Sequence, residues 1–196
     1  MIMDLFAKLA HKIGNNLVNS QIIKAEDIEI YIYGINQILV SILNIASALI
    51  LGAIFGVFYE IAVFMAAYIP LRTFAGGYHA KTPLRCYVFS MIMLAIVSVG
   101  LRYFCIADEA YYVILVISIV VILILSPVED KNKPLNEIEH KIYKKRTAII
   151  VAAELVIYLI LKIVRLDHLS EVIIYSFAVL SFMLIAGKIK KEAKYG

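Results

Sequence analysis

The chain has 196 residues, a length that fits one domain, but 63% of the residues are hydrophobic and only 17% are charged. Its mean hydropathy of +0.89 excludes an ordinary soluble domain and predicts a protein that lies in a membrane. The net charge of +4 does not indicate nucleic-acid binding, because the basic residues follow the distribution that membrane topology requires. We therefore expect an all-α membrane protein without a nucleic-acid partner.

The first 20 residues have an amphipathic pattern. Leu5, Leu9 and Ile13 recur at helical spacing, and His11 falls on the other face. Lys8 interrupts any apolar core of a cleavable signal peptide. We expect residues 1–20 to form a helix that lies in the inner membrane interface, and a solvated lead-in with chance periodicity is the alternative.

The apolar stretches that follow predict a polytopic bundle of six membrane crossings. The second and third stretches are short, at about 15 residues, so we expect local bilayer thinning or burial against neighbouring helices. The whole chain, 1–196, then forms a single integral membrane domain. The expected crossings lie at 35–58, 57–71, 87–101, 110–128, 147–164 and 169–187.

The distribution of Lys and Arg supports this number of crossings. With both termini in the cytoplasm, sixteen of the 19 basic residues fall inside. Only Arg102 and Arg165 fall outside, and Lys162 lies just within the outer end of the fifth crossing. A bias of this size sets the orientation by the positive-inside rule. Five crossings would separate the basic cytoplasmic loop 129–146 from the basic C-terminus, so six are expected.

One segment of this apolar chain gathers reactive side chains. It runs from Arg72 to Cys86, reads RTFAGGYHAKTPLRC, and by topology lies on the cytoplasmic side between the second and third crossings. Cys86 is a candidate nucleophile, and His79 is its candidate general base. The backbone N–H groups of Gly76 and Gly77 are candidate donors to an oxyanion. These residues predict a membrane-embedded cysteine hydrolase.

The spacing of His79 and Cys86 requires a break in regular helix. On an unbroken helix their separation would be roughly 10 Å along the axis, too far for a hydrogen bond. Gly76, Gly77 and Pro83 disfavour such a helix, and a folded-back segment would bring the two side chains within about 3 Å. The alternative is an ordinary basic loop, which does not require Gly-Gly, His and Cys together. A zinc site fits less well because no other His or Cys is near, so we expect no metal and no cofactor.

The same residues carry a resemblance to a known family. The order Arg72, Gly76–Gly77, His79 and Cys86 after a short membrane segment is similar to the accessory gene regulator B (AgrB) family of Gram-positive quorum sensing. The likeness covers nearly the whole chain, including the loop that begins SPVEDKNKPL. It implies a cysteine endopeptidase that cleaves the C-terminal tail of an AgrD-like precursor peptide. The acyl-enzyme would then promote cyclisation of the peptide to a thiolactone or lactone.

The resemblance also implies roles for individual residues. Cys86 would be the nucleophile and His79 the general base, and Arg72 and Gly77 would be positions needed for activity. The protein would lie among the lipids of a bacterial cell membrane. The oligomeric state stays open here, although the resemblance hints at a homodimer. A peptide transporter that uses the same crossings without covalent chemistry is the rival function.

Further candidate residues lie outside this segment. The basic loop 129–146 offers candidates to bind the acidic tail of the precursor: Lys131, Lys133 and Lys141. The alternative is that the loop binds anionic lipid, which would explain most of its positive charge. Glu154 lies inside the fifth crossing, where an ionisable side chain costs free energy and often marks a functional site. We nevertheless expect Glu154 to be structural rather than a third catalytic residue. Cys105, near the outer end of the third crossing, is expected to be a small hydrophobic residue.

Overall fold

The computed structural model describes residues 2–78, 80, 82–104, 108–129 and 135–195. The described part of the chain is helical and contains no strand, which confirms the expected all-α class. Its helices are α1 (Ile2–Asn19), the 3-10 turn η1 (Ala25–Asp27), α2 (Ile28–Phe55), α3 (Phe58–Ala75), α4 (Pro83–Tyr103), α5 (Asp108–Leu125), α6 (Glu137–Ile163) and α7 (Asp167–Tyr195).

Four helices in the described part are long and apolar enough to cross a membrane. They are α2 together with η1 (Ala25–Phe55), α3, α4, and the Asp167–Lys190 part of α7. α5 has a shorter apolar stretch, Glu109–Leu125. α6 begins with the charged sequence EIEHKIYKKR before its apolar part. The crossings predicted at 110–128 and 147–164 overlap α5 and α6, which are not among these four helices, so the number of six crossings stays a prediction.

The chain reverses between α2 and α3 at Gly56. This residue has φ 69°, in the left-handed region that glycine tolerates, and its N–H donates to the carbonyls of Ala53 and Gly52. α2 therefore ends at Phe55, before the boundary at residue 58 that hydropathy indicated. Hydropathy does not register this change, because the residues on both sides of the turn are apolar.

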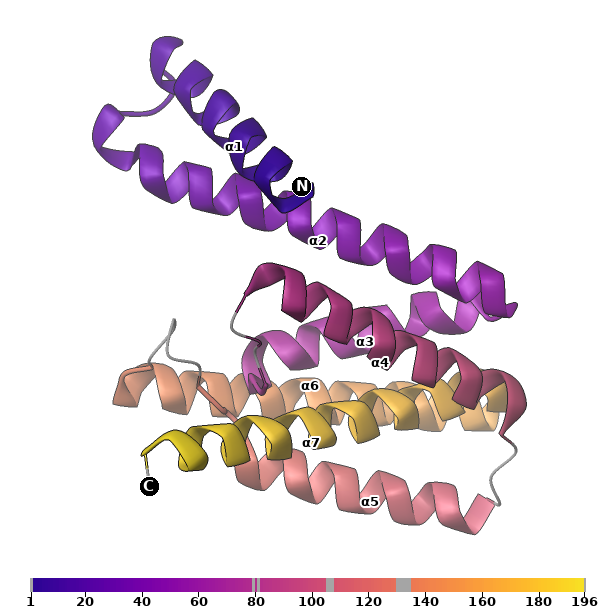
Figure 1. The fold of residues 1–196 in the computed structure, drawn as a ribbon. Coiled ribbons are helices and arrows are strands. Elements are labelled where there is room, and N and C mark those ends of the chain that lie inside the picture. Colours follow the sequence, from indigo (N-terminus) through magenta and orange to yellow (C-terminus); the bar gives the residue numbers. More distant parts are fainter. Residues whose placement is uncertain (1, 79, 81, 105–107, 130–134, 196) are drawn as a thin grey trace.

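Figure 1 shows that helices α2–α7 run alternately in opposite directions, so α3, α5 and α7 point the same way. α7 packs against both α3 and α5. The core between them contains Phe64 and Leu71 of α3, Ile122 of α5, and Phe177 and Leu184 of α7, all fully buried. Between helices in lipid, contacts of this kind stabilise through close packing rather than through removal of water.

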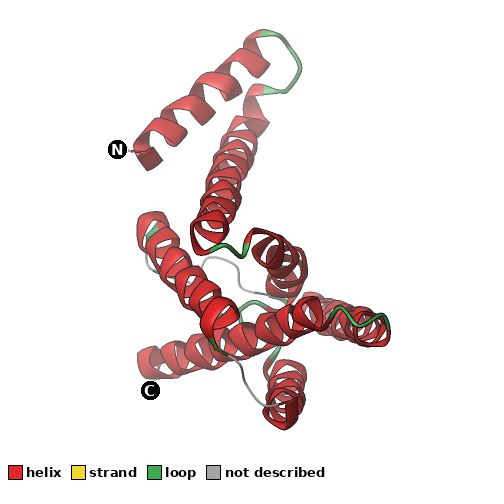
Figure 2. Cartoon of the chain, turned by 90° about the vertical axis from the view of Figure 1, so that its right-hand side faces the viewer, coloured by secondary structure: helices red, strands yellow, loops and turns green. Residues whose placement is uncertain are grey.

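The hairpin of α1 and the first part of α2 projects away from the other helices (Figure 2). The small residues Ala10 and Gly14 of α1 are buried, and a Cβ added to Gly14 would lie 2.7 Å from the side chain of Ile32 on α2. Leu5 and Leu9 remain exposed on α1. The helix expected at the N-terminus is thus present, with small residues against α2 and large apolar residues facing outward.

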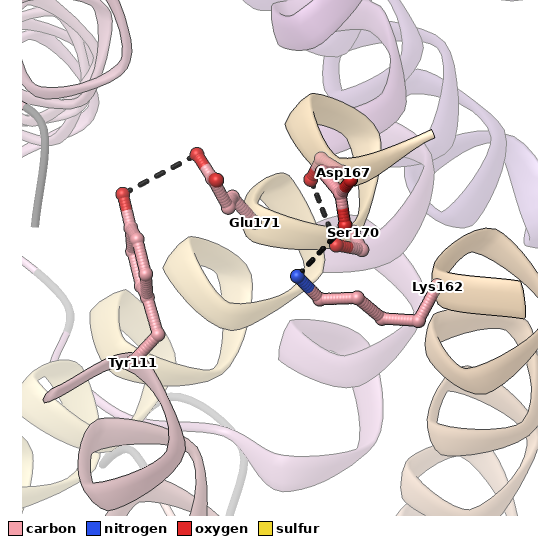
Figure 3. Close-up of polar contacts among 5 residues, drawn as sticks. All are labelled: Tyr111, Lys162, Asp167, Ser170 and Glu171. Atoms are coloured by element: carbon pink, nitrogen blue, oxygen red, sulfur yellow. Dashed lines mark hydrogen bonds and ion pairs between the residues drawn. The ribbon is translucent and has the colours of Figure 1, made fainter. Parts of the chain in front are cut away.

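Polar contacts tie α5, α6 and α7 together at the end of the bundle opposite the α3–α4 connection (Figures 1 and 3). The Tyr111 hydroxyl donates to a carboxylate oxygen of Glu171 at 3.3 Å. Lys162 donates to Asp167 at 2.9 Å across the turn between α6 and α7. The Ser170 hydroxyl donates to the Asp167 carbonyl at 2.7 Å. Substitutions in this cluster can therefore act as controls for substitutions near the reactive segment.

Candidate active site

Cys86 lies in the first turn of α4, directly after the connection from α3. Thr82 caps this helix by accepting a hydrogen bond from the Arg85 N–H at 3.3 Å, and Pro83 occupies the first turn, where a missing N–H does no harm. The Cys86 N–H donates to the Thr82 carbonyl at 3.0 Å, and the cysteine is half-buried. The positive end of a helix favours a nearby anion, and the nucleophilic form of cysteine is the thiolate.

The two glycines after α3 adopt conformations that other residues rarely adopt. Gly76 has φ 73° and Gly77 has φ 125°. A Cβ added to Gly76 would collide with the Val128 carbonyl oxygen, and one added to Gly77 would lie 2.7 Å from Nη1 of Arg72. Both positions therefore need glycine for backbone conformation and for space. This confirms that helix is interrupted where the Gly-Gly pair predicted a break.

Backbone groups from two distant segments hold the residues that follow α3. The Gly77 N–H donates to the Val128 carbonyl at 3.2 Å, and the Val128 N–H donates to the Ala75 carbonyl at 2.9 Å. The Tyr78 N–H donates to the Met183 carbonyl on α7 at 2.9 Å. The start of the reactive segment thus lies where the ends of α3 and α5 meet α7.

These hydrogen bonds bear on the predicted oxyanion donors. The Gly76 N–H donates to the Arg72 carbonyl at 3.1 Å, and the Gly77 N–H donates to Val128. An oxyanion would have to displace a protein carbonyl from either group. The oxyanion role of the two glycines stays a prediction, whereas the structure gives them a conformational role.

The Arg72 side chain closes this turn. Its Nη2 donates to the Tyr78 carbonyl, while its Nη1 is buried and has no hydrogen-bond partner among the described residues. Tyr68, one turn earlier on α3, is also buried. Arg72 therefore connects the last turns of α3 to the reactive segment.

Residues of α7 support the same segment. The Tyr78 ring lies between two partners: its centroid is 5.3 Å from the Phe89 ring on α4 and 4.9 Å from Nζ of Lys190 on α7. Gly187 lies against the backbone of Gly77 and Tyr78, because a Cβ added to it would be 2.7 Å from the Gly77 carbonyl carbon. The sequence motif contains no sign of these contacts. A glycine near the end of the last apolar stretch was the only available signal.

Four of the residues singled out in the sequence lie outside the described part of the structure: His79, Cys105, Lys131 and Lys133. Lys141 is described and is exposed on α6. Nearby on α6, the Tyr143 ring lies 5.6 Å from the Phe74 ring of α3. The Arg146 guanidinium, also on α6, lies 5.2 Å from the centroid of the same Phe74 ring. The basic start of α6 therefore lies beside the last turn of α3.

Glu154 is buried in α6, with 5% of its surface exposed. Its Oε2 has no hydrogen-bond partner within the described residues. Val151 and Tyr158, about one turn away on either side, are also buried. No three His, Cys, Asp or Glu side chains in the described part gather in a way that could hold a metal ion.

The fold and site define a helical membrane protein with a cysteine at the start of a helix, next to a Gly-Gly turn held by an arginine. The model of the accessory gene regulator B family matches residues 7–184, and the chain belongs to this family. The resemblance found in the sequence is thus confirmed. Membership supports a role in processing a quorum-sensing autoinducer peptide and an interaction with a propeptide.

Two relatives illustrate how far the chain has diverged. It is 24% identical to the AgrB-like protein 2 of Clostridium perfringens over 173 residues, which cover 85% of this chain and 78% of that protein. It is 26% identical to protein FsrB of Enterococcus faecalis over 144 residues, which cover 72% of this chain and 58% of that protein. No solved structure matches the chain.

The packing of α7 on the reactive segment generates a prediction. Gly187→Ala should slow peptide processing at least about tenfold, because the added Cβ would push the Gly77–Tyr78 backbone and misplacement by about 1 Å is costly in catalysis. Gly34→Ala is the matched control, since a Cβ at Gly34 would meet nothing within 4 Å. Precursor cleavage and thermal stability of both variants, measured in detergent, check this. Equal cleavage by the two variants would show that α7 does not position the segment.

Proposed function

We propose that the chain is a membrane-embedded cysteine endopeptidase. It removes the C-terminal tail of a quorum-sensing precursor peptide and promotes cyclisation of the remainder to a thiolactone or lactone. The observation that carries the proposal is the position of Cys86 in the N-terminal turn of α4, directly after the connection that Arg72 and the Val128 and Met183 carbonyls hold in shape. A thiolate there benefits from the positive end of the helix.

The first half of the proposed reaction makes an acyl-enzyme. His79 takes the proton of the Cys86 thiol, and Sγ attacks the scissile carbonyl carbon as the carbonyl π electrons move to the oxygen. The tetrahedral species then re-forms the C=O bond and breaks the C–N bond. The amine of the released tail takes the proton from His79, so the histidine returns to its starting state.

The second half closes the ring. A Cys or Ser side chain of the same peptide gives its proton to His79 and attacks the thioester carbonyl carbon. The C=O bond re-forms as the bond to Sγ of Cys86 breaks, and the Cys86 sulfur takes the proton back from His79. Water must be kept away, because a thioester otherwise hydrolyses. The half-buried position of Cys86 at the start of an apolar helix supports this requirement.

We further propose six crossings, with both termini and the reactive segment in the cytoplasm and α1 in the inner interface. The alternating directions of α2–α7 and the exposed Leu5 and Leu9 on α1 support this arrangement. In this orientation the basic start of α6, which includes Lys141, lies on the same side as the reactive segment. Lys141, with Lys131 and Lys133, would then bind the acidic tail of the precursor.

Replacing the two cysteines separately tests the chemistry. Cys86→Ala should abolish precursor cleavage while the protein still inserts into the membrane, because the nucleophile is lost. Cys105→Ala should leave cleavage within about twofold of wild type, as expected of a small hydrophobic residue without a catalytic role. Mass spectrometry of a co-expressed precursor measures both. Loss of cleavage with Cys105→Ala but not with Cys86→Ala would overturn the assignment.

The role of His79 can be separated from that of the nearby cations. His79→Ala and His79→Gln should each reduce cleavage by about 10²–10⁴-fold, the usual contribution of a general acid–base. Both should also slow alkylation of Cys86 by iodoacetamide near neutral pH, because the proton acceptor is gone. Arg72→Ala and Arg85→Ala are the controls that show whether a cationic side chain, rather than His79, activates the sulfur. Alkylation that persists in both His79 variants but slows in an arginine variant would mean that cations activate the sulfur.

Labelling of single cysteines tests the topology. In a Cys-free variant, a cysteine at Glu137 should be protected from an impermeant maleimide added to whole cells, and one at Glu109 should react. Both positions are exposed. Glu137 is preferable to Asn136, whose side chain caps α6 by accepting from the Glu139 N–H at 2.8 Å. Reaction at both sites would be incompatible with six crossings.

A further inference from the structure

Tyr68 is a buried hydroxyl beside the reactive segment that the mechanism above does not use. It lies one turn before Arg72 on α3, with 8% of its surface exposed. Its ring stacks on Phe64, with centroids 5.2 Å apart and planes 13° from parallel. Because the ring is held by this stack, the hydroxyl has a defined position next to Arg72.

The Arg72 guanidinium is held in a similar way. The hydrogen bond from Nη2 to the Tyr78 carbonyl fixes the plane of the fork. Nη1 is left buried without an acceptor among the described residues. A buried donor without a partner costs about 1–3 kcal/mol, and more when it is charged. This cost is removed when a bound substrate supplies an acceptor atom for Nη1.

Four backbone donors of the reactive segment are already occupied. The N–H groups of Gly76, Gly77 and Tyr78 all donate to protein carbonyls, which hold the turn in shape. The Cys86 N–H donates to the Thr82 carbonyl in the first turn of α4. These four groups are therefore not free to bind an oxyanion. The described residues also offer two side-chain donors on one face of α3, the Tyr68 hydroxyl and Nη1 of Arg72.

We propose that the Tyr68 hydroxyl and Nη1 of Arg72 form the oxyanion-binding pair of this active site, an inference that rests on the proposed cysteine chemistry. As Sγ of Cys86 bonds to the carbonyl carbon and the π electrons move to oxygen, both groups donate hydrogen bonds to that oxygen. The bonds weaken when C=O re-forms and the C–N bond breaks. Neither group gives up its proton, so both end the step unchanged.

The spacing of the two donors follows from the helix. Residues four apart on a helix lie on the same face, about 5–6 Å apart at their Cβ atoms, so both side chains can reach one small acceptor. Arg72 donates to the Tyr78 carbonyl, and the Tyr78 ring lies 5.3 Å from the Phe89 ring, three residues after Cys86 on α4, so the end of α3 is linked to the first turns of α4. An arginine also supplies a full positive charge where the negative charge develops.

The test compares two reactions of the same sulfur in purified protein. Tyr68→Phe keeps the ring that stacks on Phe64 and removes the hydroxyl. Release of the tail from a synthetic precursor peptide should slow about 10²-fold at saturating peptide, the usual effect of losing one oxyanion donor, with KM little changed. Alkylation of Cys86 by iodoacetamide should stay within about twofold of wild type, because substitution at a tetrahedral carbon forms no oxyanion.

Two further variants complete the experiment. Tyr111→Phe removes another buried hydroxyl, the one that donates to Glu171 near the other end of the bundle, and should cleave like wild type. Arg72→Lys keeps the charge but loses the fork, and should show the same selective loss of cleavage as Tyr68→Phe. If Tyr68→Phe does not fold, Arg72→Lys still tests the proposed oxyanion pair.

The outcomes distinguish this inference from the proposed function. Cleavage that requires Cys86 but is equal in Tyr68→Phe and Tyr111→Phe would overturn the oxyanion pair and leave the endopeptidase intact. A parallel loss of cleavage and alkylation in Tyr68→Phe would assign the hydroxyl a structural role instead, which also overturns the pair. Wild-type protein that releases no tail, or releases it without Cys86, would remove the proposed function and this inference together.

Discussion

The parallel bridge between Gly76 and Val128 is the constraint on which the reactive segment depends. A non-helical connection next to membrane helices must find protein partners for its N–H and C=O groups, because lipid offers none. Here Val128 and Met183 supply the carbonyls, so α5 and α7 determine the shape of a segment that follows α3. The reactive segment thus begins at the common end of three helices that point the same way.

Different helices contribute different parts of the proposed site. α4 carries Cys86, the proposed nucleophile, and α3 carries Tyr68 and Arg72, the proposed donors. α5 and the segment after it, with α7, supply backbone acceptors that hold the turn between α3 and α4. A side chain at Gly76 or Gly77 would collide with these partners, whereas the long Arg72 side chain reaches the Tyr78 carbonyl. For the same reason we expect packing far from Cys86, at Gly187, to bear on its chemistry.

Much of this could be predicted from the sequence, for physical reasons. Apolar length indicated the helices, and Pro83 indicated that no unbroken helix runs through the reactive segment. The predicted third crossing, 87–101, missed the first turn of α4, which begins at Pro83, where proline is tolerated. The contributions of Val128 and Met183 could not be predicted, since a backbone carbonyl has the same chemistry in every residue and leaves no signal in the sequence. The end of α2 was missed because Gly56 changes the backbone conformation without changing hydropathy.

The hydrogen bond from Tyr78 to Met183 has a consequence for the order in which the molecule is made. A ribosome produces the reactive segment long before it produces α7, so the Tyr78 N–H and the surface that Gly187 covers have no partner when α3 and α4 first enter the bilayer. The backbone of this segment therefore gains the Met183 acceptor only when almost the whole chain has been synthesised.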